Sequence, residues 1–536
     1  MTAVRPNDSH EPSRRNGIGP ASVPEADVTA AGGSWLTRPM AVLTLVLVWA
    51  LAHLLLRGLS SSVIGTDDMM ENVFLQTLEA GYSLRQPPLY EWLLWPLQQL
   101  TGPTIWSFLI LKYGLVLAAC ACLLALARLA MPPLTAAFCV LSFSALYQFG
   151  WNLHEGVTHT LVLVLACAAT TLALVRALLR GGTAAYLLLG LAIGAGLLSK
   201  HSFLLFAAAL ALAVISDRFW RSRLSAKGLA LSACVAALCY APYLIWLLDQ
   251  PRGLVGASTA VLVTGEATSH AARSALGLAR LGWSLFGFSM PFLVLVLALF
   301  WREVAPGRPE GGDPLSARAA VARLCGRTVL FAIAIAAVAI LVSGATYVKE
   351  RHMHPVLLLL PVWLFARIGV SEPQRFRRLG MVLLALAVLA FLIRVPGLVA
   401  PERAFCGGVC RHMKPYDALV PDLAELGPDR ATLIGDDDYT AGNLRALFPG
   451  ARIVGPSWRP PTPPREICLL VWEAGDGALS LASSDVLARF PRLPVQDLAA
   501  APRAIAAGWP HPWKDDAHRV TTFGVAELVP SSSFCH

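Results

Sequence analysis

The sequence predicts an α-helical polytopic membrane protein with about eleven transmembrane helices, followed by a soluble C-terminal α/β domain. Of the 536 residues, 56% are hydrophobic and only 14% are charged, whereas soluble globular proteins carry about 25% charged residues. Long apolar runs recur up to about residue 395, and none long enough to span a bilayer follows. The composition therefore excludes an ordinary soluble enzyme, and no feature of it indicates a nucleic-acid partner.

The chain opens with a polar tail and a first membrane span. Residues 1–37 are rich in Pro, Ala and Ser and have no apolar core of their own, so they predict a disordered cytoplasmic tail instead of a cleaved signal peptide. The run 39–56 follows Arg38 and is close to the roughly 20 residues that cross a hydrocarbon core. It is the first predicted helix of a transmembrane module covering residues 38–395.

Further apolar runs predict the remaining spans at residues 103–127, 134–150, 156–175, 185–198, 203–215, 228–248, 283–300, 329–344, 356–368 and 381–393. Two neighbouring runs, 185–198 and 203–215, are too short to cross alone and predict a hairpin of half-depth helices. Its polar tip, residues 199–202, would lie at or below the far membrane face. Non-helical backbone is tolerated at that depth only inside protein or beside a water-filled cavity.

The basic residues predict the orientation of the module. With the N-terminus in the cytoplasm, nineteen Lys and Arg residues lie on the inner side, against eight in the opposite loops before the C-terminal domain. The positive-inside rule favours this arrangement. The loop 57–103 and the C-terminal domain are then periplasmic, and the protein is predicted to lie in a bacterial inner membrane.

Residues 396–536 predict the soluble domain, because short apolar runs alternate there with turn signals. The segments 431–435 and 467–472 predict buried strands, and 440–448 predicts a helix between them. The domain contains Cys406, Cys410, Cys468 and Cys535, in a compartment where disulfides persist. Cys406 and Cys410 are close enough to pair with each other, but four cysteines allow three connectivities. A zinc site is the weaker interpretation, since no second ligand pair follows at suitable spacing.

The first outer loop is the strongest functional candidate. It places Asp67 and Asp68 just beyond the first span, with further acids at Glu71, Glu79 and Glu91. Such a loop is acidic enough to hold a divalent cation or to supply a general base, and the competing interpretation is a solvated acidic loop. Within it, residues 70–79 predict an amphipathic helix whose apolar stripe (Val73, Phe74, Leu75 and Leu78) lies along the membrane interface.

These residues resemble a known family. Asp-Asp soon after the first span, an interfacial helix and then Gln-Pro-Pro-Leu-Tyr-Glu-Trp-Leu at residues 86–93 are similar to the first outer loop of GT-C fold, polyprenyl-phosphate-sugar-dependent glycosyltransferases. Within that family, the sequence most resembles the protein mannosyltransferases of glycosyltransferase family 39 and the lipid A aminoarabinose transferases. Two later segments, 194–200 (Gly-Ala-Gly-Leu-Leu-Ser-Lys) and 349–355 (Lys-Glu-Arg-His-Met-His-Pro), agree with this resemblance, which covers roughly residues 40–395.

The resemblance implies roles for the acids. Asp67 matches the family's catalytic base, which takes a proton from the acceptor hydroxyl as it attacks the anomeric carbon. Asp68 departs from the more usual Glu and would help to bind a metal or the acceptor. Glu155 is the best match for a second acid between the third and fourth spans, although the usual Asp is absent. With His154 and His159 close by, Glu155 and Asp67 form an oxygen and nitrogen set that suits a divalent cation; a satisfied polar core residue is the other interpretation of His159.

A lipid phosphate leaving group calls for cations at the membrane interface. Lys200, at the tip of the short hairpin, is the first candidate, because an ionisable residue at that depth indicates function; snorkelling to the interface is the alternative. Lys349 and Arg351, with Tyr347 beside them, form a second cluster, and Arg85 is near enough to contribute. Lys112 lies within a span, where we expect it to pair with a buried acid or carbonyl, and it is assigned no role.

The sequence therefore predicts a membrane glycosyltransferase that moves a hexosyl or pentosyl group from a polyprenyl-phosphate donor to an acceptor on the outer face of the inner membrane. The acceptor is left open between a lipid, a glycan and a protein. A transporter or flippase of lipid-linked sugars that breaks no bond is the alternative, although no internal repeat supports it. A family member that only binds lipid is a third interpretation.

Overall fold

The computed structural model describes residues 34–65, 67–250, 269–305, 316–400, 410–475, 482–513 and 519–536. Residues 35–536 form one compact unit, and the description below concerns that unit. The predicted tail, residues 1–37, lies almost entirely outside the described residues. The predicted boundaries of the transmembrane module and of the C-terminal domain remain predictions, and the last helix of the module continues past residue 395 to Val399.

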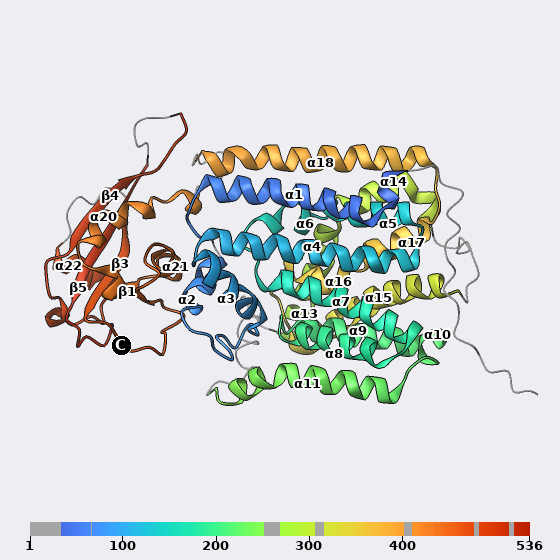
Figure 1. The fold of residues 1–536 in the computed structure, drawn as a ribbon, viewed down its shortest axis with the longest axis horizontal. Helices are drawn as coiled ribbons and strands as arrows, with labels where there is room; N and C mark the ends of the chain where they lie inside the picture. Colours follow the sequence, from blue (N-terminus) through green and yellow to red (C-terminus); the bar gives the residue numbers. More distant parts are fainter. Residues whose placement is uncertain are drawn as a thin grey trace, which may run out of the picture. The chain divides into compact units, whose positions relative to one another are not determined.

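Six of the described helices are long and apolar enough to cross a membrane: α1 (Pro39–Ser60), α4 (Ile105–Ala130), α7 (His159–Arg180), α11 (Ala226–Leu248), α15 (Ala317–Ser343) and α18 (Pro373–Val399). Helix α1 contacts both α4 and α18, and Figure 1 shows these three helices running beside one another. Large apolar side chains such as Leu384 (66% exposed) and Leu392 (58% exposed) cover the outer face of α18. A face of this kind is suited to acyl chains.

Two short apolar helices lie where the hairpin was predicted, and its half-depth place in the membrane stays a prediction. Helices α8 (Thr183–Leu197) and α9 (Phe203–Ser216) are apolar and are separated by a turn at residues 198–202. Glycine lets α8 lie close to α11: an added Cβ at Gly190 would be 2.7 Å from the carbonyl oxygen of Ser232. A short helix, α10 (Arg218–Arg221), follows the hairpin.

Three runs predicted as single spans are interrupted. The run 283–300 is wrong as one helix, because α13 (His270–Ser289) and α14 (Phe292–Val304) are separated at Pro291, which has no N–H for a helical hydrogen bond. The carbonyl oxygen of Met290 instead accepts a hydrogen bond from the backbone N–H of Tyr147 at 3.1 Å.

The run 134–150 is divided into α5 (Pro133–Leu141), η2 (Ser142–Ala145) and α6 (Tyr147–Gly150). The run 356–368 is divided into α16 (His354–Leu357) and α17 (Leu360–Ile368). Short 3-10 turns precede several helices, at η1 (Trp35–Thr37), η3 (Asn152–His154) and η4 (Glu350–Met353).

The first outer loop contains α2 (Asp68–Phe74) and α3 (Leu89–Thr101). The predicted interfacial helix 70–79 is wrong in extent, since α2 begins two residues earlier and ends at Phe74. Its predicted apolar stripe is also divided, because Val73 is fully buried whereas Leu78 is 55% exposed. Val73 belongs to the core of the C-terminal domain, so α2 buries its apolar side against protein.

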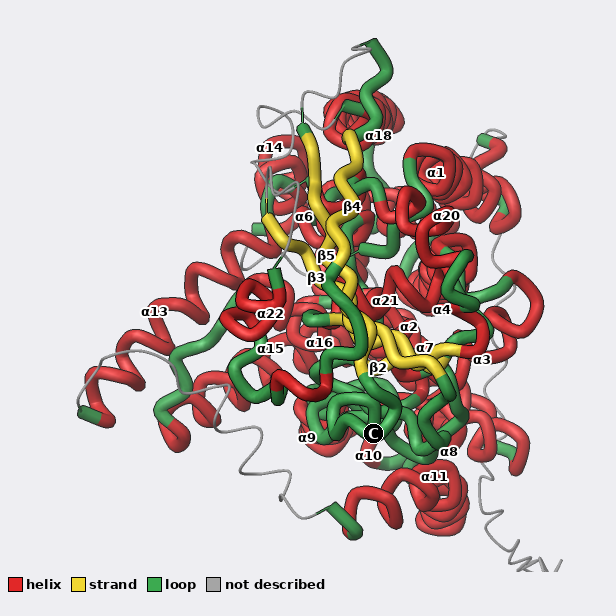
Figure 2. Tube along the Cα trace, turned by 90° about the vertical axis from the view of Figure 1, so that its left-hand side faces the viewer, coloured by secondary structure: helices red, strands yellow, loops and turns green. Residues whose placement is uncertain are grey.

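The C-terminal domain is built on a five-stranded sheet in the order β2-β1-β3-β5-β4 (Figure 2). Its strands are β1 (Ala431–Gly435), β2 (Arg452–Val454), β3 (Ile467–Gly475), β4 (Arg503–Gly508) and β5 (Val520–Leu528). Strand β1 is parallel to β2 and β3, and β5 is antiparallel to β3 and β4. The strands predicted at 431–435 and 467–472 are confirmed.

Helices accompany this sheet at α20 (Leu419–Ala424), α21 (Asp438–Leu447) and α22 (Ser483–Arg489), with short 3-10 turns η5 (Arg411–Met413), η6 (Tyr416–Ala418), η7 (Pro428–Arg430) and η8 (Val495–Asp497). Helix α21 confirms the helix predicted near 440–448. A disulfide joins Cys468 to Cys535. Cys410 is also disulfide-bonded, and Cys406, the neighbour that the sequence places close enough to pair with it, lies outside the described residues.

The first outer loop is fastened to the C-terminal domain by side-chain amides. Asn443 of α21 accepts a hydrogen bond from the backbone N–H of Ile64 at 2.8 Å and donates to its carbonyl oxygen at 3.4 Å. Gln76 makes the same pair of bonds with Ile453 of β2, at 2.7 and 2.8 Å. Gly442 permits close contact between helices, because an added Cβ there would be 2.4 Å from the carbonyl oxygen of Met69 in α2. The domain therefore sets the position of the loop that carries Asp67.

Candidate active site

Asp67 and Asp68 lie at the start of α2 in different surroundings. Asp67 occupies the position before the first helical residue and is exposed, whereas Asp68 is only 3% exposed. Successive helical residues point about 100° apart, so one side chain can face outward while the next faces the core. The loop before α7 passes directly against Asp67, since an added Cβ at Gly156 would be 2.8 Å from its backbone nitrogen. Asp67 is thus the acid that is open to an incoming group.

Charges of both signs act on Asp67. The surrounding protein raises the pKa of Asp67 by desolvation, Arg351 opposes this rise, and Glu71 adds to it. Lys112 and Lys200 also favour the ionised form. A carboxylate whose pKa is raised toward neutrality is a better general base than an ordinary aspartate.

The predicted phosphate-binding residue Lys200 is brought to this place by the α8–α9 hairpin. Its Nζ donates to Thr160 Oγ1 at 3.1 Å. The pKa of Lys200 is lowered to about 8, mainly by burial; Arg351 contributes to this fall, and Asp67 opposes it. Arg85 also acts electrostatically on Lys200. Lys200 is therefore a cation whose charge is sensitive to pH near neutrality.

Two backbone contacts hold the hairpin against the first outer loop. The backbone N–H of Leu89 donates to the carbonyl oxygen of Leu198 at 3.0 Å. His201 Nε2 lies 3.2 Å from the carbonyl oxygen of Leu84, one residue before Arg85. These contacts explain how residues far apart in sequence come to share one electrostatic environment.

The second predicted cationic cluster lies before α16. Arg351 donates from Nη2 to the hydroxyl of Tyr347 at 2.8 Å, and Lys349 Nζ lies 4.8 Å from the centre of the Tyr347 ring. Arg351 acts on both Asp67 and Lys200. Lys349 is placed beside Tyr347. The structure thus brings Arg351 and Lys200 into the electrostatic surroundings of Asp67, and Arg85 into those of Lys200.

Glu155 is held by its backbone more than by its side chain. The side chain is 62% exposed and lies 3.5 Å from Arg394 of α18. Its carbonyl oxygen accepts a hydrogen bond from Lys112 Nζ at 2.5 Å, and the same ammonium lies 4.0 Å from Asp68 Oδ2. The expected pairing of Lys112 with a buried acid and a carbonyl is confirmed. Burial raises the pKa of Asp68 to about 6, and Lys112 opposes that rise.

His154 belongs to a separate buried network. Its Nδ1 lies 2.8 Å from the hydroxyl of Tyr113, and its ring stacks on His53 with ring centres 3.6 Å apart. Arg394 joins both histidines, at 2.9 Å from His53 Nδ1 and 3.3 Å from the His154 carbonyl oxygen. Burial lowers the pKa of His154 well below its ordinary value. This network fixes the backbone leading into Glu155.

The predicted metal set is not gathered in the structure. His154 and Glu155 face the partners just described, whereas His159 Nε2 lies 3.0 Å from Glu71 Oε1 and 3.6 Å from Glu91 Oε1. In the described part of the chain, Glu71, Glu91 and His159 form the group with metal-ligand spacing. The predicted grouping of His154, His159 and Glu155 is corrected accordingly, because His154 is turned toward Tyr113 and Glu155 toward Arg394. Burial, followed by the charge of Glu71, raises the pKa of Glu91 well above its ordinary value.

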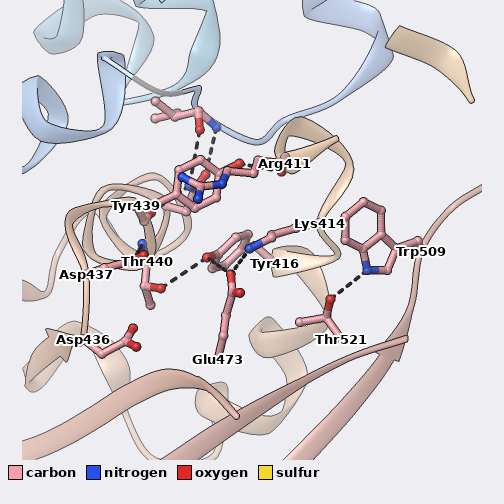
Figure 3. A network of polar contacts seen from close by, with 12 residues as sticks. Arg411, Lys414, Tyr416, Asp436, Asp437, Tyr439, Thr440, Glu473, Trp509 and Thr521 are labelled. Atoms are coloured by element: carbon pink, nitrogen blue, oxygen red, sulfur yellow. Dashed lines mark hydrogen bonds and ion pairs between the residues drawn. The ribbon is translucent and has the colours of Figure 1, made fainter. Parts of the chain in front are cut away.

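The C-terminal domain carries a further polar network on the side of α21 (Figure 3). Glu473 of β3 accepts hydrogen bonds from Lys414 and from the hydroxyl of Tyr416, the latter at 3.1 Å. Thr440 Oγ1 lies 3.3 Å from the same hydroxyl. Tyr439 donates to the carbonyl oxygen of Arg411 at 2.5 Å. This network ties the segment after α18 to the sheet and so supports the attachment of the domain to the first loop.

Sequence reasoning missed three contributors to the site. Glu71 and Glu91 appeared only as members of an acidic loop, and Arg394, one residue beyond the last predicted span, was not considered. The sequence did contain a signal for the two glutamates, because each is next to a large apolar residue that is expected to be buried. A carboxylate buried beside such a residue needs a partner. The sequence could not predict that this partner is His159, because His159 is far from both glutamates along the chain.

Comparison with known proteins also indicates a glycosyltransferase. The family model described as dolichyl-phosphate-mannose-protein mannosyltransferase matches residues 85–246. A lipopolysaccharide core galacturonosyltransferase from Rhizobium johnstonii, RgtB, is 28% identical over 405 residues, which cover 74% of this chain and 80% of the relative. A second such enzyme from the same organism, RgtA, is 29% identical over 443 residues, covering 80% and 85%.

The fold is that of a solved glycosyltransferase. The crystal structure of ArnT from Cupriavidus metallidurans bound to undecaprenyl phosphate matches with a TM-score of 0.56 and 15% identity, covering 94% of this chain and 99% of that one. At this identity the likeness concerns the fold. Together with the sequence relatives it favours an enzyme over the alternative transporter or flippase. The predicted resemblance is confirmed: the chain is a membrane glycosyltransferase with a GT-C-like fold, and it is similar in sequence to lipopolysaccharide core galacturonosyltransferases.

Proposed function

We propose that this chain transfers a hexuronosyl group from a polyprenyl-phosphate donor to a saccharide hydroxyl of a lipopolysaccharide-core-like acceptor. The sugar and acceptor classes are taken from the galacturonosyltransferases to which the chain is similar over most of its length. The polyprenyl carrier accords with the fold shared with an enzyme bound to undecaprenyl phosphate. The reaction takes place on the periplasmic face, with the N-terminus in the cytoplasm, as the distribution of basic residues favours.

The observation that carries this proposal is the convergence of one open carboxylate and several cations. Asp67 is exposed and lies in the field of Arg351, Lys200 and Lys112. A lipid-phosphate sugar needs this combination, because its phosphate becomes more negative as the glycosidic bond breaks. The Arg fork suits phosphate oxygens bidentately, and Lys acts as a point charge.

The proposed reaction is a direct displacement. The acceptor hydroxyl attacks the anomeric carbon, and its proton passes to Asp67. The bond from the anomeric carbon to the phosphate oxygen breaks, and the electron pair leaves with the lipid phosphate. Lys200 and Arg351, with Arg85 and Lys349, neutralise that charge, while Tyr347 orients Arg351 through its hydroxyl. Attack from the face opposite the leaving group inverts the anomeric centre.

The other acids have supporting roles in this proposal. Asp68 is turned inward against Lys112 and positions the start of α2, so it is not placed at the reacting atoms. Glu155 is exposed on the segment that packs against Asp67, where it can accept a hydrogen bond from the acceptor saccharide. The C-terminal domain covers the loop that carries Asp67 and contributes to the choice of acceptor.

The test is sugar transfer by the full-length protein reconstituted in lipid, with polyprenyl-phosphate galacturonic acid, mannose and aminoarabinose as donors. We expect Asp67→Asn to lower transfer by roughly 10²-fold or more, the range of general-base contributions. Glu79→Gln changes another acid of the same loop and is the matched control. Equal activity of Asp67→Asn and wild type would refute the assignment of the base, and a preference for mannose or aminoarabinose would refute the proposed sugar class.

A further inference from the structure

Three buried side chains outside the proposed reaction meet where α2, α3 and α7 come together. Glu71 (1% exposed), Glu91 (0%) and His159 (1%) come from these three helices in turn. One ligand atom from each lies within 4.8 Å of the other two. His159 is the first residue of α7, so its ring is placed at the end of a span that leads away from the loop.

The two carboxylates lack ordinary compensation. Within the described ranges, no hydrogen-bond donor from the rest of the protein reaches either oxygen of Glu91 or the Oε2 atom of Glu71, and the side chain that acts on Glu91 by hydrogen bonding is Glu71 itself. The ion pairs found for these glutamates in the same part of the chain involve His159 alone. Lys112 is directed to Asp68 and to the Glu155 carbonyl instead. Carboxylates buried without a cation are costly, and the cost is higher when two are adjacent.

We propose that Glu71, Glu91 and His159 bind a divalent transition-metal ion, with Zn²⁺ as the best fit. Imidazole nitrogen and carboxylate oxygen are both ligands of Zn²⁺, which binds either kind of atom at about 2.0–2.2 Å. Tetrahedral coordination at those lengths separates neighbouring ligand atoms by about 3.3–3.6 Å. The separations of 3.0 Å and 3.6 Å between His159 Nε2 and the two carboxylate oxygens need little adjustment. Glu91 Oε1, which has no hydrogen-bond partner within the described residues, is the oxygen that lies 3.6 Å from His159 Nε2 and is available to the ion.

The site is structural and lies apart from the proposed reacting atoms. Glu71 follows Asp67 by four residues, about one helical turn, on a helix of only seven residues. A helix that short is not stable alone. A metal that joins α2 to α3 and α7 would hold the start of the helix, and with it Asp67, at a fixed place beside the α8–α9 hairpin.

The test measures metal content and thermal stability of the full-length protein in detergent. The wild type is stripped with chelator, dialysed against Zn²⁺ and washed, and zinc is measured by mass spectrometry. We expect about one Zn²⁺ per chain, a fall of tenfold or more in bound zinc for Glu91→Gln and for His159→Ala, and full retention in Glu79→Gln. Chelation should lower the melting temperature of wild type and Glu79→Gln but not that of the two site variants.

A measurement on the wild type alone covers the case in which the variants do not fold. Co²⁺ exchanged into the site should give visible absorption of a four-coordinate nitrogen and oxygen site, and zinc X-ray absorption should give one nitrogen among oxygen ligands at about 2.0 Å. Absence of zinc above the level of a Glu71→Gln/Glu91→Gln double variant would overturn the proposal. The two glutamates would then share a proton, and Glu91→Gln would raise the melting temperature. Sugar transfer is not used as a readout, so failure here leaves the proposed function untouched.

Discussion

At the scale of single residues, Asp67 and Asp68 show how position gives two identical, adjacent side chains different surroundings. Asp67 is open and surrounded by cations that belong to other segments. Asp68 is buried against Lys112 and has one oxygen without a hydrogen-bond partner. The sequence predicted both as catalytic candidates because adjacency alone does not say which one faces the core. The short helix α2 decides it.

The pH dependence of transfer should report Asp67 and Lys200. Activity rises as Asp67 loses its proton, over a range above that of an ordinary aspartate because its pKa is raised by desolvation. Activity falls as Lys200 loses its proton, since burial lowers the pKa of Lys200 to about 8. Replacing Lys200 by Arg should move this alkaline fall upward by at least one pH unit, because guanidinium stays protonated. The check is the rate against pH for wild type and Lys200→Arg.

Lys227→Arg makes the same exchange at an exposed position after α10 and should leave the profile unchanged. An alkaline limb that does not move in Lys200→Arg would show that another group sets it.

Lys112 should be tested together with its acid. Lys112→Met leaves Asp68 buried without its ion-pair partner, and breaking such a pair costs about 3–5 kcal/mol. Adding Asp68→Asn removes the uncompensated charge and should recover part of the lost melting temperature. The measurement is thermal unfolding of the two single variants and the double variant. A double variant as unstable as the sum of the single ones would mean that the two side chains do not interact.

At the scale of elements, the contact of α2 with α21 connects the first outer loop to the C-terminal domain. Both helices are short, and neither is stabilised by length. Gly442 brings their backbones together, and Asn443 closes the contact with two hydrogen bonds to Ile64. The sequence predicted α21 correctly but placed the helix of the first loop at the membrane interface. The apolar stripe was present, and only its partner was misassigned.

Gly442→Ala should separate these helices. Its new Cβ would be 2.4 Å from a backbone oxygen of Met69, which cannot move aside as a side chain can. We expect a loss of about 1–3 kcal/mol, typical of overpacking, with a fall in transfer because α2 carries Asp67. Gly282→Ala is the control, since an added Cβ there meets nothing within 4 Å. Unchanged melting temperature and rate in Gly442→Ala would show that the contact does not hold the loop.

At the scale of the whole molecule, the distribution of free and bridged cysteines bears on the orientation of the chain in the membrane, and so on the face where the proposed reaction takes place. The seven free cysteines among the described residues lie between Cys120 and Cys325, within or beside the helical module, whereas the bridge between Cys468 and Cys535 is in the C-terminal domain. Disulfides persist in oxidising compartments. The bridge therefore agrees with the orientation that the basic residues favour.

Reporter fusions should check this orientation. Alkaline phosphatase, which needs its own disulfides, is expected to be active when fused after His536 and inactive when fused after Arg223, in the loop that follows α10. A fluorescent protein that matures in the cytoplasm should give the reverse pattern. Phosphatase activity at Arg223 and none at His536 would invert the proposed topology and move the reaction to the cytoplasmic face.

The sequence supported the main elements of the fold better than the site. Strand β1 matches its predicted bounds, and the α8–α9 hairpin was recognised because two runs were too short to span. The run 283–300 was predicted as one helix although Pro291 lies within it and is a known helix breaker. Glu71 is separated along the chain from Glu91 by 20 positions and from His159 by 88. No local sequence pattern predicts contacts between residues so far apart. Asp67 and Lys200 were selected as candidates because each was an ionisable residue at a membrane boundary, and their roles stay predictions.

The pair of hydrogen bonds between Gln76 and Ile453 has a consequence for what can bind the domain. Strand β2 is at one edge of the sheet, and an extended peptide adds to a sheet by pairing with unoccupied backbone groups at such an edge. At Ile453 the amide of Gln76 already takes both the N–H and the carbonyl, as a neighbouring strand would. This edge is thereby closed to polypeptide strands and protected from self-association. A partner that binds on this side of the domain therefore has to be recognised through side-chain contacts, which is how proteins commonly bind saccharides.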